Sequence, residues 1–185
     1  MENYSVGAKL HIGCGCKRVP DWINADAVPG VGDVVIDLHK LALPARTFAV
    51  IYGSHVLEHC WAEDTPRILG ELHAALVPGG TLRLSVPDLR LVVAHCLDSQ
   101  IYGGEASALS VIFGGSYGRA TLDPDRHRQA FWHERLLHLM QEAGFRDVRL
   151  WRPGQYPEID ALGDYATQPQ HKGLSTISLN MEGAR

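Results

Sequence analysis

The chain has 185 residues, of which 45% are hydrophobic and 21% are charged, and its formal net charge is -4 at pH 7. These values predict one domain over residues 1–185 with a full hydrophobic core. The negative charge argues against a duplex nucleic-acid-binding surface, which would need a basic stripe. The start, MENYSVGAK, has no apolar signal segment, and no run reaches about 18 apolar residues. We therefore expect a soluble, cytoplasmic protein that does not enter a membrane.

Apolar patterning predicts four strands in the first third of the chain, at residues 8–13, 22–26, 33–37 and 48–55. The links between the first three are shorter than the dozen or so residues that a parallel crossover needs, so no full helix fits there. Apolar residues at helical spacing then alternate with short apolar runs. The expected helices are 64–76, 88–98 and 132–143, and the expected strands are 81–86, 145–151 and 174–181.

Two long segments lack a regular pattern. Residues 99–130 are rich in Gly, Ser and polar groups, and residues 153–173 follow the predicted strand 145–151. Long weakly periodic segments inside a compact domain are usually functional lids or disordered. We expect 99–130 to be an inserted lid and 153–173 to be a second loop over the substrate.

The stretch from Lys9 to Asp26, KLHIGCGCKRVPDWINAD, is typical of a strand, a glycine turn, a second strand and an acid. Gly13 and Gly15 have no Cβ, so a ligand can approach the main chain closely. A carboxylate such as Asp26 can accept hydrogen bonds from both hydroxyls of a ribose. Arg18 stands where a dinucleotide motif has its third glycine, and the acid comes early, which favours a nucleoside cofactor without phosphate. A plain tight turn is the alternative.

The ten histidines raise the question of a metal. His55, Glu58 and His59 form the H-x-x-E-H pattern of some zinc hydrolases. His55 ends a predicted buried strand, however, and residues 61–64 interrupt any helix that could bring both imidazoles to one face. The four cysteines have no zinc-ribbon spacing either. We expect no metal, and a zinc hydrolase remains the weaker alternative.

Several motifs in order resemble one known family. They are KLHIGCG at 9–15, Asp26, Asp37-Leu38, FAVIYGSHVLEH at 48–59, LVPGGTLRL at 76–84 and EAGFRD at 142–147. Together they look like the class I S-adenosylmethionine-dependent methyltransferases, in particular the small predicted methyltransferase branch related to the type 11 group. The likeness covers residues 8–98 well and 131–182 more loosely. It implies an α/β, doubly wound, Rossmann-like sheet of six parallel strands and an antiparallel last one, here with short early crossovers.

The resemblance also implies which residues bind S-adenosylmethionine. The glycine turn would line the methionine part, Asp26 would hold the ribose, Asp37 and Leu38 would bracket the adenine, and the end of the fourth strand would meet the methionine end. His11 stands where many relatives have an acid for the amino group of the cofactor. The full expected set is His11, Gly13, Cys14, Gly15, Asp26, Asp37, Leu38, Gly53 and Ser54.

Methyl transfer needs a base only if the acceptor is protonated when it reacts. The candidates near the carboxyl ends of the strands are His55 and Asp88. Asp88 follows a proline at a predicted helix start, so a plain N-terminal cap is the alternative for its side chain.

The methyl acceptor is the feature of the reaction that the sequence determines least. Aromatic and scattered polar groups of the two long loops suit a small molecule or a glycan-type substrate. These residues are Tyr102, Tyr117, Tyr156, Asp160 and Tyr165, with Phe131 and Trp132 just after the first loop. A homodimer is left open. His11 and the short crossovers motivate an alternative, a non-catalytic binding module that keeps the fold.

Overall fold

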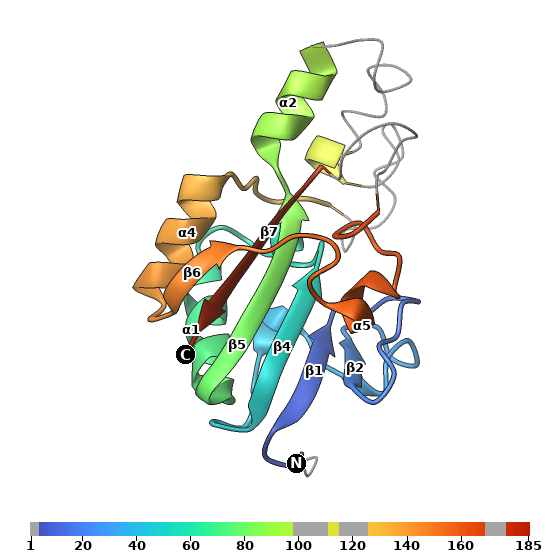
Figure 1. Cartoon of the computed structure of the whole chain (residues 1–185), viewed down its shortest axis with the longest axis vertical. Coiled ribbons are helices and arrows are strands. Elements are labelled where there is room, and N and C mark those ends of the chain that lie inside the picture. The colour runs from blue at the N-terminus through green and yellow to red at the C-terminus, as the bar shows by residue number, and fades with distance from the viewer. Residues whose placement is uncertain (1–3, 98–110, 115–125, 169–176) are drawn as a thin grey trace.

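The computed structural model describes residues 4–97, 111–114, 126–168 and 177–185. This part of the chain contains one seven-stranded sheet with helices packed on it (Figure 1). The strands are β1 (Ala8–Ile12), β2 (Ile23–Asp26), β3 (Val34–Val35), β4 (Phe48–Ser54), β5 (Leu76–Pro87), β6 (Arg146–Leu150) and β7 (Ser178–Ala184). Their order is β3-β2-β1-β4-β5-β7-β6, and only β7 runs antiparallel to its neighbours. The doubly wound, mostly parallel sheet with an antiparallel last strand is thereby confirmed.

The expected helices are also present, each within two residues of its predicted bounds. The helical elements are the 3₁₀ turns η1 (Leu38–Lys40) and η2 (Leu57–His59), and the helices α1 (Thr65–Ala75), α2 (Leu89–Leu97), α4 (His133–Glu142) and α5 (Pro157–Asp160). α5 was not predicted, because four residues are too few to show helical periodicity. No helix in the described part of the chain is both long and apolar enough to span a bilayer.

The short early crossovers are confirmed. Residues 13–22 join β1 to β2 and residues 27–33 join β2 to β3, both without a helix, and η1 is the only helical turn between β3 and β4 in this fully described stretch. Irregular segments, and not helices, therefore connect the first strands of the sheet.

Two strand boundaries differ from the prediction. β5 begins at Leu76, directly after α1, because Leu76 already pairs with Phe48 before the register shifts and Thr81 pairs with Val50. β7 covers 178–184, where 174–181 was expected, and residues 174–176 lie outside the described residues. The end of β7 contains the charged residue Glu182, which pairs with arginines on both neighbouring strands. Because this end is polar, the apolar pattern did not predict it.

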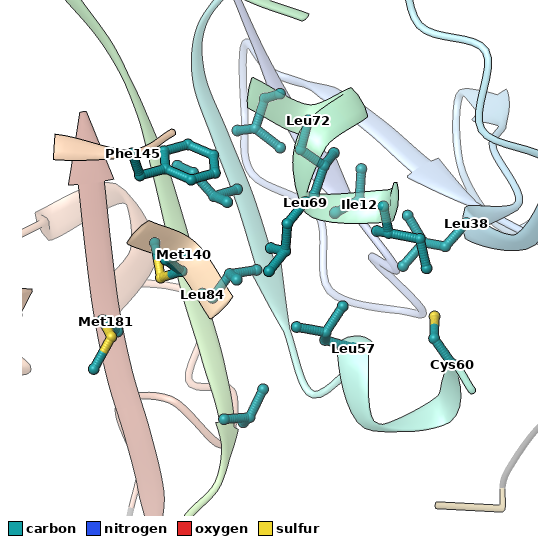
Figure 2. Packing of buried hydrophobic residues seen from close by; sticks show 14 of the residues in the cluster. Ile12, Leu38, Leu57, Cys60, Leu69, Leu72, Leu84, Met140, Phe145 and Met181 are labelled. Atoms are coloured by element: carbon teal, nitrogen blue, oxygen red, sulfur yellow. The ribbon is translucent and has the colours of Figure 1, made fainter. Parts of the chain in front are cut away.

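One face of the sheet packs against α1 and α4 and forms the main core. Figure 2 shows Leu69 and Leu72 of α1 in one cluster with Leu84 of β5 and Ile12 of β1. These residues are buried because α1 carries its apolar side chains at helical spacing. The main core is thus the face that the sequence pattern described best.

Gly70 is the residue of α1 with the lowest helix propensity apart from Pro66 near its start. A Cβ built there would meet no atom within 4 Å, whereas one at Gly80 would lie 2.9 Å from the carbonyl oxygen of Val77. We expect Gly70→Ala to raise the free energy of unfolding by about 0.5–1 kcal/mol, because alanine loses less backbone entropy in a helix. Urea unfolding measures this change. The same substitution at Gly80 is the contrast and should destabilise the chain; a loss of stability in Gly70→Ala would contradict the expectation.

The opposite face of the sheet is covered by a second apolar cluster. Side chains alternate along β4, so Ile51 faces the main core while Val50 and Tyr52 face the other side. The residues that cover this side come from the β1–β2 link and from the segment 151–168. They are Val19, Trp22, Trp151, Ile159, Leu162 and Ala166.

This packing differs from the expectation that residues 153–173 form only a loop over the substrate. Of the predicted segment 153–173, residues 153–168 are described, and they hold buried Ile159 rather than only solvent-exposed groups. The hydroxyl of Tyr156, an expected substrate contact, donates a hydrogen bond to Oε2 of Glu182 on β7, and the guanidinium of Arg83 lies 3.5 Å from the centre of its ring. The described part of this segment therefore contributes to the core.

One hydrogen bond ties the segment 151–168 to the sheet. The hydroxyl of Tyr52, a fully buried side chain of β4, donates to Oδ2 of Asp164 at 2.6 Å. We expect Tyr52→Phe to lower the free energy of unfolding by about 1.5 kcal/mol, because it removes a hydrogen bond to a charged group and leaves the ring in place. Urea unfolding would show the loss, and Tyr165→Phe, at an exposed ring of the same segment, is the matched control. Equal stability of both variants would show that the bond contributes nothing.

Candidate active site

The carboxyl ends of β1, β2, β3 and β4 meet at one edge of the sheet, because parallel strands end on the same side. A cavity of about 610 Å³ opens there, within the roughly 300–1,000 Å³ typical of small-molecule sites. Its wall consists of Gly13, Asp26, Ala27, Val28, Ile36, Asp37, Leu38, His39, His55, Val56, His59, Cys60, Trp61 and Arg128. Five predicted site residues are in this set: Gly13, Asp26, Asp37, Leu38 and His55.

Asp26 and the glycine turn are in direct contact. Oδ2 of Asp26 accepts a hydrogen bond from the main-chain N–H of Gly15 at 2.9 Å, and Oδ1 accepts one from Val28 at 2.9 Å. Each carboxylate oxygen has two acceptor sites, so each keeps one for a further donor. The bend after β1 and the acid that ends β2 therefore form adjoining parts of the cavity wall.

The glycine turn needs its glycines for two different reasons. Gly13 and Gly15 have φ of +63° and +50°, in the left-handed region that other residues rarely adopt. A Cβ on Gly13 would lie 2.6 Å from Cγ2 of Val56, whereas a Cβ on Gly15 would meet no atom within 4 Å. Cys14 between them is buried, and its N–H donates to the carbonyl of Ala25. Cys14 and Gly15 support the wall without being part of it.

Three other expected cofactor residues, His11, Gly53 and Ser54, are not part of the cavity wall. His11 is 2% exposed, lies on the second face of the sheet and stacks on the Tyr52 ring with centroids 5.1 Å apart. Its Nδ1 is 3.4 Å from Oδ1 of Asn24. Burial lowers the pKa of His11 despite this contact, so the side chain is a neutral part of the core.

Asp37 has a local role as well as a place in the wall. Its Oδ1 accepts a hydrogen bond from the N–H of His39 at 2.9 Å and so caps η1. Leu38, the first residue of η1, reaches both the cavity and the main core. The cap fixes the position of this pair at the carboxyl end of β3.

His55 follows β4 with φ of +51°. Its Nε2 lies 2.8 Å from Oγ of Ser178, and its Nδ1 lies 3.5 Å from Oε1 of Glu58. The ring of Tyr165 is 5.2 Å away. Burial, together with the neighbouring His127 and His59, lowers the pKa of His55 to about 3. The imidazole is therefore neutral at physiological pH and is a weak base.

Asp88 is placed differently from the other predicted site residues. Its Oδ1 accepts a hydrogen bond from the N–H of Arg90 at 2.9 Å at the start of α2, and it is not in the cavity wall. This is the capping geometry that the sequence left open as the alternative. A catalytic role for Asp88 stays a prediction.

The structure adds wall residues that sequence reasoning missed, chiefly Trp61 and Arg128. The guanidinium of Arg128 lies 4.8 Å from the centre of the Trp61 ring and donates to the carbonyl of His59 at 3.0 Å. The side-chain amide of Gln129 donates to the carbonyls of Leu57 and Cys60. These bonds hold residues 126–131 against the turn after β4. Trp61 could have been noticed as an aromatic residue close behind a strand end, but no local signal points to Arg128.

Residues 126–130 are the end of the predicted lid. Most of that lid, 99–110 and 115–125, lies outside the described residues, together with Tyr102 and Tyr117. The lid therefore stays a prediction.

The side chain of Glu58 does not brace the turn after β4 through hydrogen bonds to the described residues. Its side chain is 1% exposed, and neither carboxylate oxygen has a hydrogen-bond partner among the described residues. Burial raises the pKa of Glu58 to about 8. The brace is instead made by its main-chain carbonyl, which accepts from the N–H of Arg128 at 2.8 Å.

Comparison with known sequences decides what kind of protein carries this cavity. Residues 12–150 match the sequence model of a family described as a methyltransferase domain, which is well over half of the chain. The chain belongs to this methyltransferase family. A search of curated proteins gave no match.

Solved structures agree with the family. An S-adenosylmethionine-dependent methyltransferase from Thermotoga maritima, described as a possible histamine N-methyltransferase, is 19% identical with a TM-score of 0.58, over 96% of this chain and 82% of that one. A similar methyltransferase from Mesorhizobium loti is 18% identical with a TM-score of 0.53, over 100% and 94%. One from Archaeoglobus fulgidus is 15% identical with a TM-score of 0.56, over 97% and 86%. At these identities the likeness shows the fold.

The methyltransferase is therefore an enzyme, and S-adenosylmethionine is its cofactor, as the sequence predicted. The finer assignment to a branch related to the type 11 group stays a prediction. The match gives no support to the binding-module or zinc-hydrolase alternatives.

Proposed function

We propose that this methyltransferase transfers a methyl group from S-adenosylmethionine to a small-molecule or sugar-type acceptor, in the cavity at the carboxyl ends of β1 to β4. The observation that carries the proposal is the convergence of Gly13, Asp26, Asp37, Leu38 and His55 on one cavity of about 610 Å³. These residues come from four separate places in the sequence.

The residues of the cavity fit the cofactor in chemistry and in space. Asp26 has an acceptor site left on each oxygen for the two ribose hydroxyls. Asp37 and Leu38 would bracket the adenine, with the exposed ring of Trp61 in the same wall. Next to the wall, a Cβ on Gly15 would meet no atom within 4 Å, and this open space would give the methionine part room. His11 would act only from behind the wall.

The chemistry asked of the protein is mainly positioning. When bound, S-adenosylmethionine supplies a methyl group on a sulfonium, which is already an activated electrophile. The cavity has to align the acceptor with it, and alignment alone can supply on the order of 7–11 kcal/mol of a barrier. His55 and the nearby Tyr165 would help to orient the acceptor, because His55 is a neutral hydrogen-bonding group in the wall.

The small size of the acceptor is supported by the shape and the charge of the site. The cavity is concave, holds aromatic and scattered polar groups, and belongs to a chain with net charge -4, which suits a small molecule better than a nucleic-acid duplex. Two structural neighbours are named for small amines, a possible histamine N-methyltransferase and a phosphoethanolamine N-methyltransferase.

The proposal is tested in two steps with the whole chain. Calorimetric titration with S-adenosylmethionine should give one site per chain, and a panel of small amines, alcohols and sugars should then be screened for release of S-adenosylhomocysteine. Turnover of at least one small acceptor is the expected result. Binding of the cofactor with turnover only on a protein or a nucleic acid would overturn the proposed acceptor class.

A further inference from the structure

Three side chains that can ligate a metal meet beside the cavity. One ligand atom from each of Glu58, His59 and His127 lies within 4.8 Å of the other two. Glu58 and His59 belong to η2, and His127 comes from the segment 126–131 much later in the chain. Main-chain bonds hold the two parts together independently of these side chains, because the N–H of Arg128 donates to the carbonyl of Glu58 at 2.8 Å.

Glu58 is the member of this cluster that needs an explanation. Its carboxylate is buried, and the described residues offer it no hydrogen bond. Oε1 lies 3.5 Å from Nδ1 of His55 and 3.9 Å from Nε2 of His127, close to both rings but bonded to neither. Buried carboxylates in proteins are normally paired, hydrogen-bonded or bound to a metal. A buried acid without such a bond among the described residues, beside two imidazoles, has the position and the chemistry of a metal ligand.

The two imidazoles are held as metal-ligating histidines usually are, by a main-chain contact on the ring. Nδ1 of His59 lies 3.3 Å from the carbonyl oxygen of Arg126. His127 hydrogen-bonds the main chain of Val111 and directs its Nε2 towards Glu58. The two rings are edge to face, with centroids 4.8 Å apart. Their positions are therefore set by main-chain atoms.

There is also a small space beside the carboxylate. A cavity of about 10 Å³, which is about the room that one water-sized particle needs, is lined by Glu58, His127 and Gln129 together with seven apolar residues. His59 is part of the wall of the large cavity. The cluster thus lies between the large cavity and this small one.

We propose that Glu58, His59 and His127 form a binding site for one divalent first-row transition-metal ion. Two imidazoles and one carboxylate are a donor set that suits Zn²⁺, Fe²⁺, Co²⁺ or Ni²⁺ better than Mg²⁺ or Ca²⁺. In a tetrahedral site, ligand atoms about 2.0–2.2 Å from the ion are roughly 3.3–3.6 Å apart. Binding therefore has to bring a pair at the present limit of 4.8 Å closer by roughly 1.2–1.5 Å, which is within the reach of side-chain rotation.

This site differs from the H-x-x-E-H reading of the sequence. In that pattern His55 and His59 would both ligate from one helix. Here His55 is bonded to Ser178 through Nε2, and the second histidine of the cluster is His127. The site adds an ion to the wall of a methyltransferase cavity and implies no hydrolase.

Cobalt is the sharpest probe of the site, because Co²⁺ has visible d–d bands that depend on its ligands. Protein without a histidine tag is stripped with a chelator, titrated with Co²⁺, and then with Zn²⁺ to displace it. We expect one Co²⁺ per chain. Glu58→Gln and His127→Ala should each weaken Co²⁺ binding by on the order of 100-fold or more, since loss of an outer-shell partner alone typically costs about 10–100-fold.

His138→Ala is the matched control, because its ring pairs with Glu142 on the exposed side of α4 and lies apart from the cluster. It should bind Co²⁺ as the unchanged chain does. Calorimetry with S-adenosylmethionine on the same samples shows whether each variant is folded. Zn²⁺ should raise the melting temperature of the unchanged chain and of His138→Ala, but not of Glu58→Gln or His127→Ala. Absence of d–d bands, equal Co²⁺ binding in Glu58→Gln, or a thiolate charge-transfer band from cysteine ligation would overturn the site.

Discussion

Asp26→Ala is expected to weaken the binding of S-adenosylmethionine by about 1–3 kcal/mol, or roughly 5- to 150-fold in Kd. The substitution removes a charged acceptor that would face both ribose hydroxyls. It also releases the N–H groups of Gly15 and Val28, which both bond to this carboxylate. The glycine turn and the end of β2 then lose their direct link. Isothermal titration calorimetry on the whole chain measures the change in affinity.

Asp26→Asn is the matched variant for this prediction. It keeps one oxygen acceptor and the volume of the side chain but removes the charge, so its affinity should lie between those of the unchanged chain and Asp26→Ala. Melting temperatures without cofactor separate a loss of fold from a loss of binding. Unchanged affinity in both variants would show that Asp26 does not hold the ribose.

Gly13→Ala should lower the free energy of unfolding by about 2–5 kcal/mol. Part of this cost, about 1–2 kcal/mol, comes from a left-handed backbone with a Cβ, since φ is +63°. The rest, about 1–3 kcal/mol, comes from crowding, because the new Cβ would lie 2.6 Å from Cγ2 and 2.8 Å from Cβ of Val56. Urea unfolding gives the sum.

Gly7→Ala separates the two contributions. Gly7 has φ of +88°, and a Cβ there would meet no atom within 4 Å, so this variant should show the backbone cost alone. Adding Val56→Ala to Gly13→Ala should then recover part of the crowding cost in a double-mutant cycle. Equal losses in Gly7→Ala and Gly13→Ala would mean that the turn is not packed against Val56.

The order of the elements could be predicted because the central strands are continuous apolar runs and the helices carry clear apolar faces. β4 and α1 are the best examples, and both have the expected bounds to within a residue or two. The site at the ends of these strands could be predicted for a related reason: the residues that follow parallel strands must meet at one edge. Gly13, Asp26 and Asp37 are in the cavity wall on that ground.

The remainder depended on contacts between distant segments. Arg128 reaches the cavity because Gln129 and the main chain of residues 126–131 bind the turn after β4, and no local pattern records this. His11 was expected at the cofactor, but side chains alternate along β1, and this one faces the second side of the sheet. The same alternation explains why the neighbouring Ile12 lies in the main core.

The segment 151–168 contacts both the hydrophobic core and a residue of the cavity wall. Its apolar residues cover the face of the sheet opposite α1 and α4, and its Tyr165 lies 5.2 Å from the ring of His55, which lines the cavity. Replacing the segment by that of another methyltransferase would therefore exchange part of the hydrophobic interior as well. A library that varies this segment and keeps the chain folded would therefore have to change exposed side chains such as Tyr165 and leave the buried ones in place.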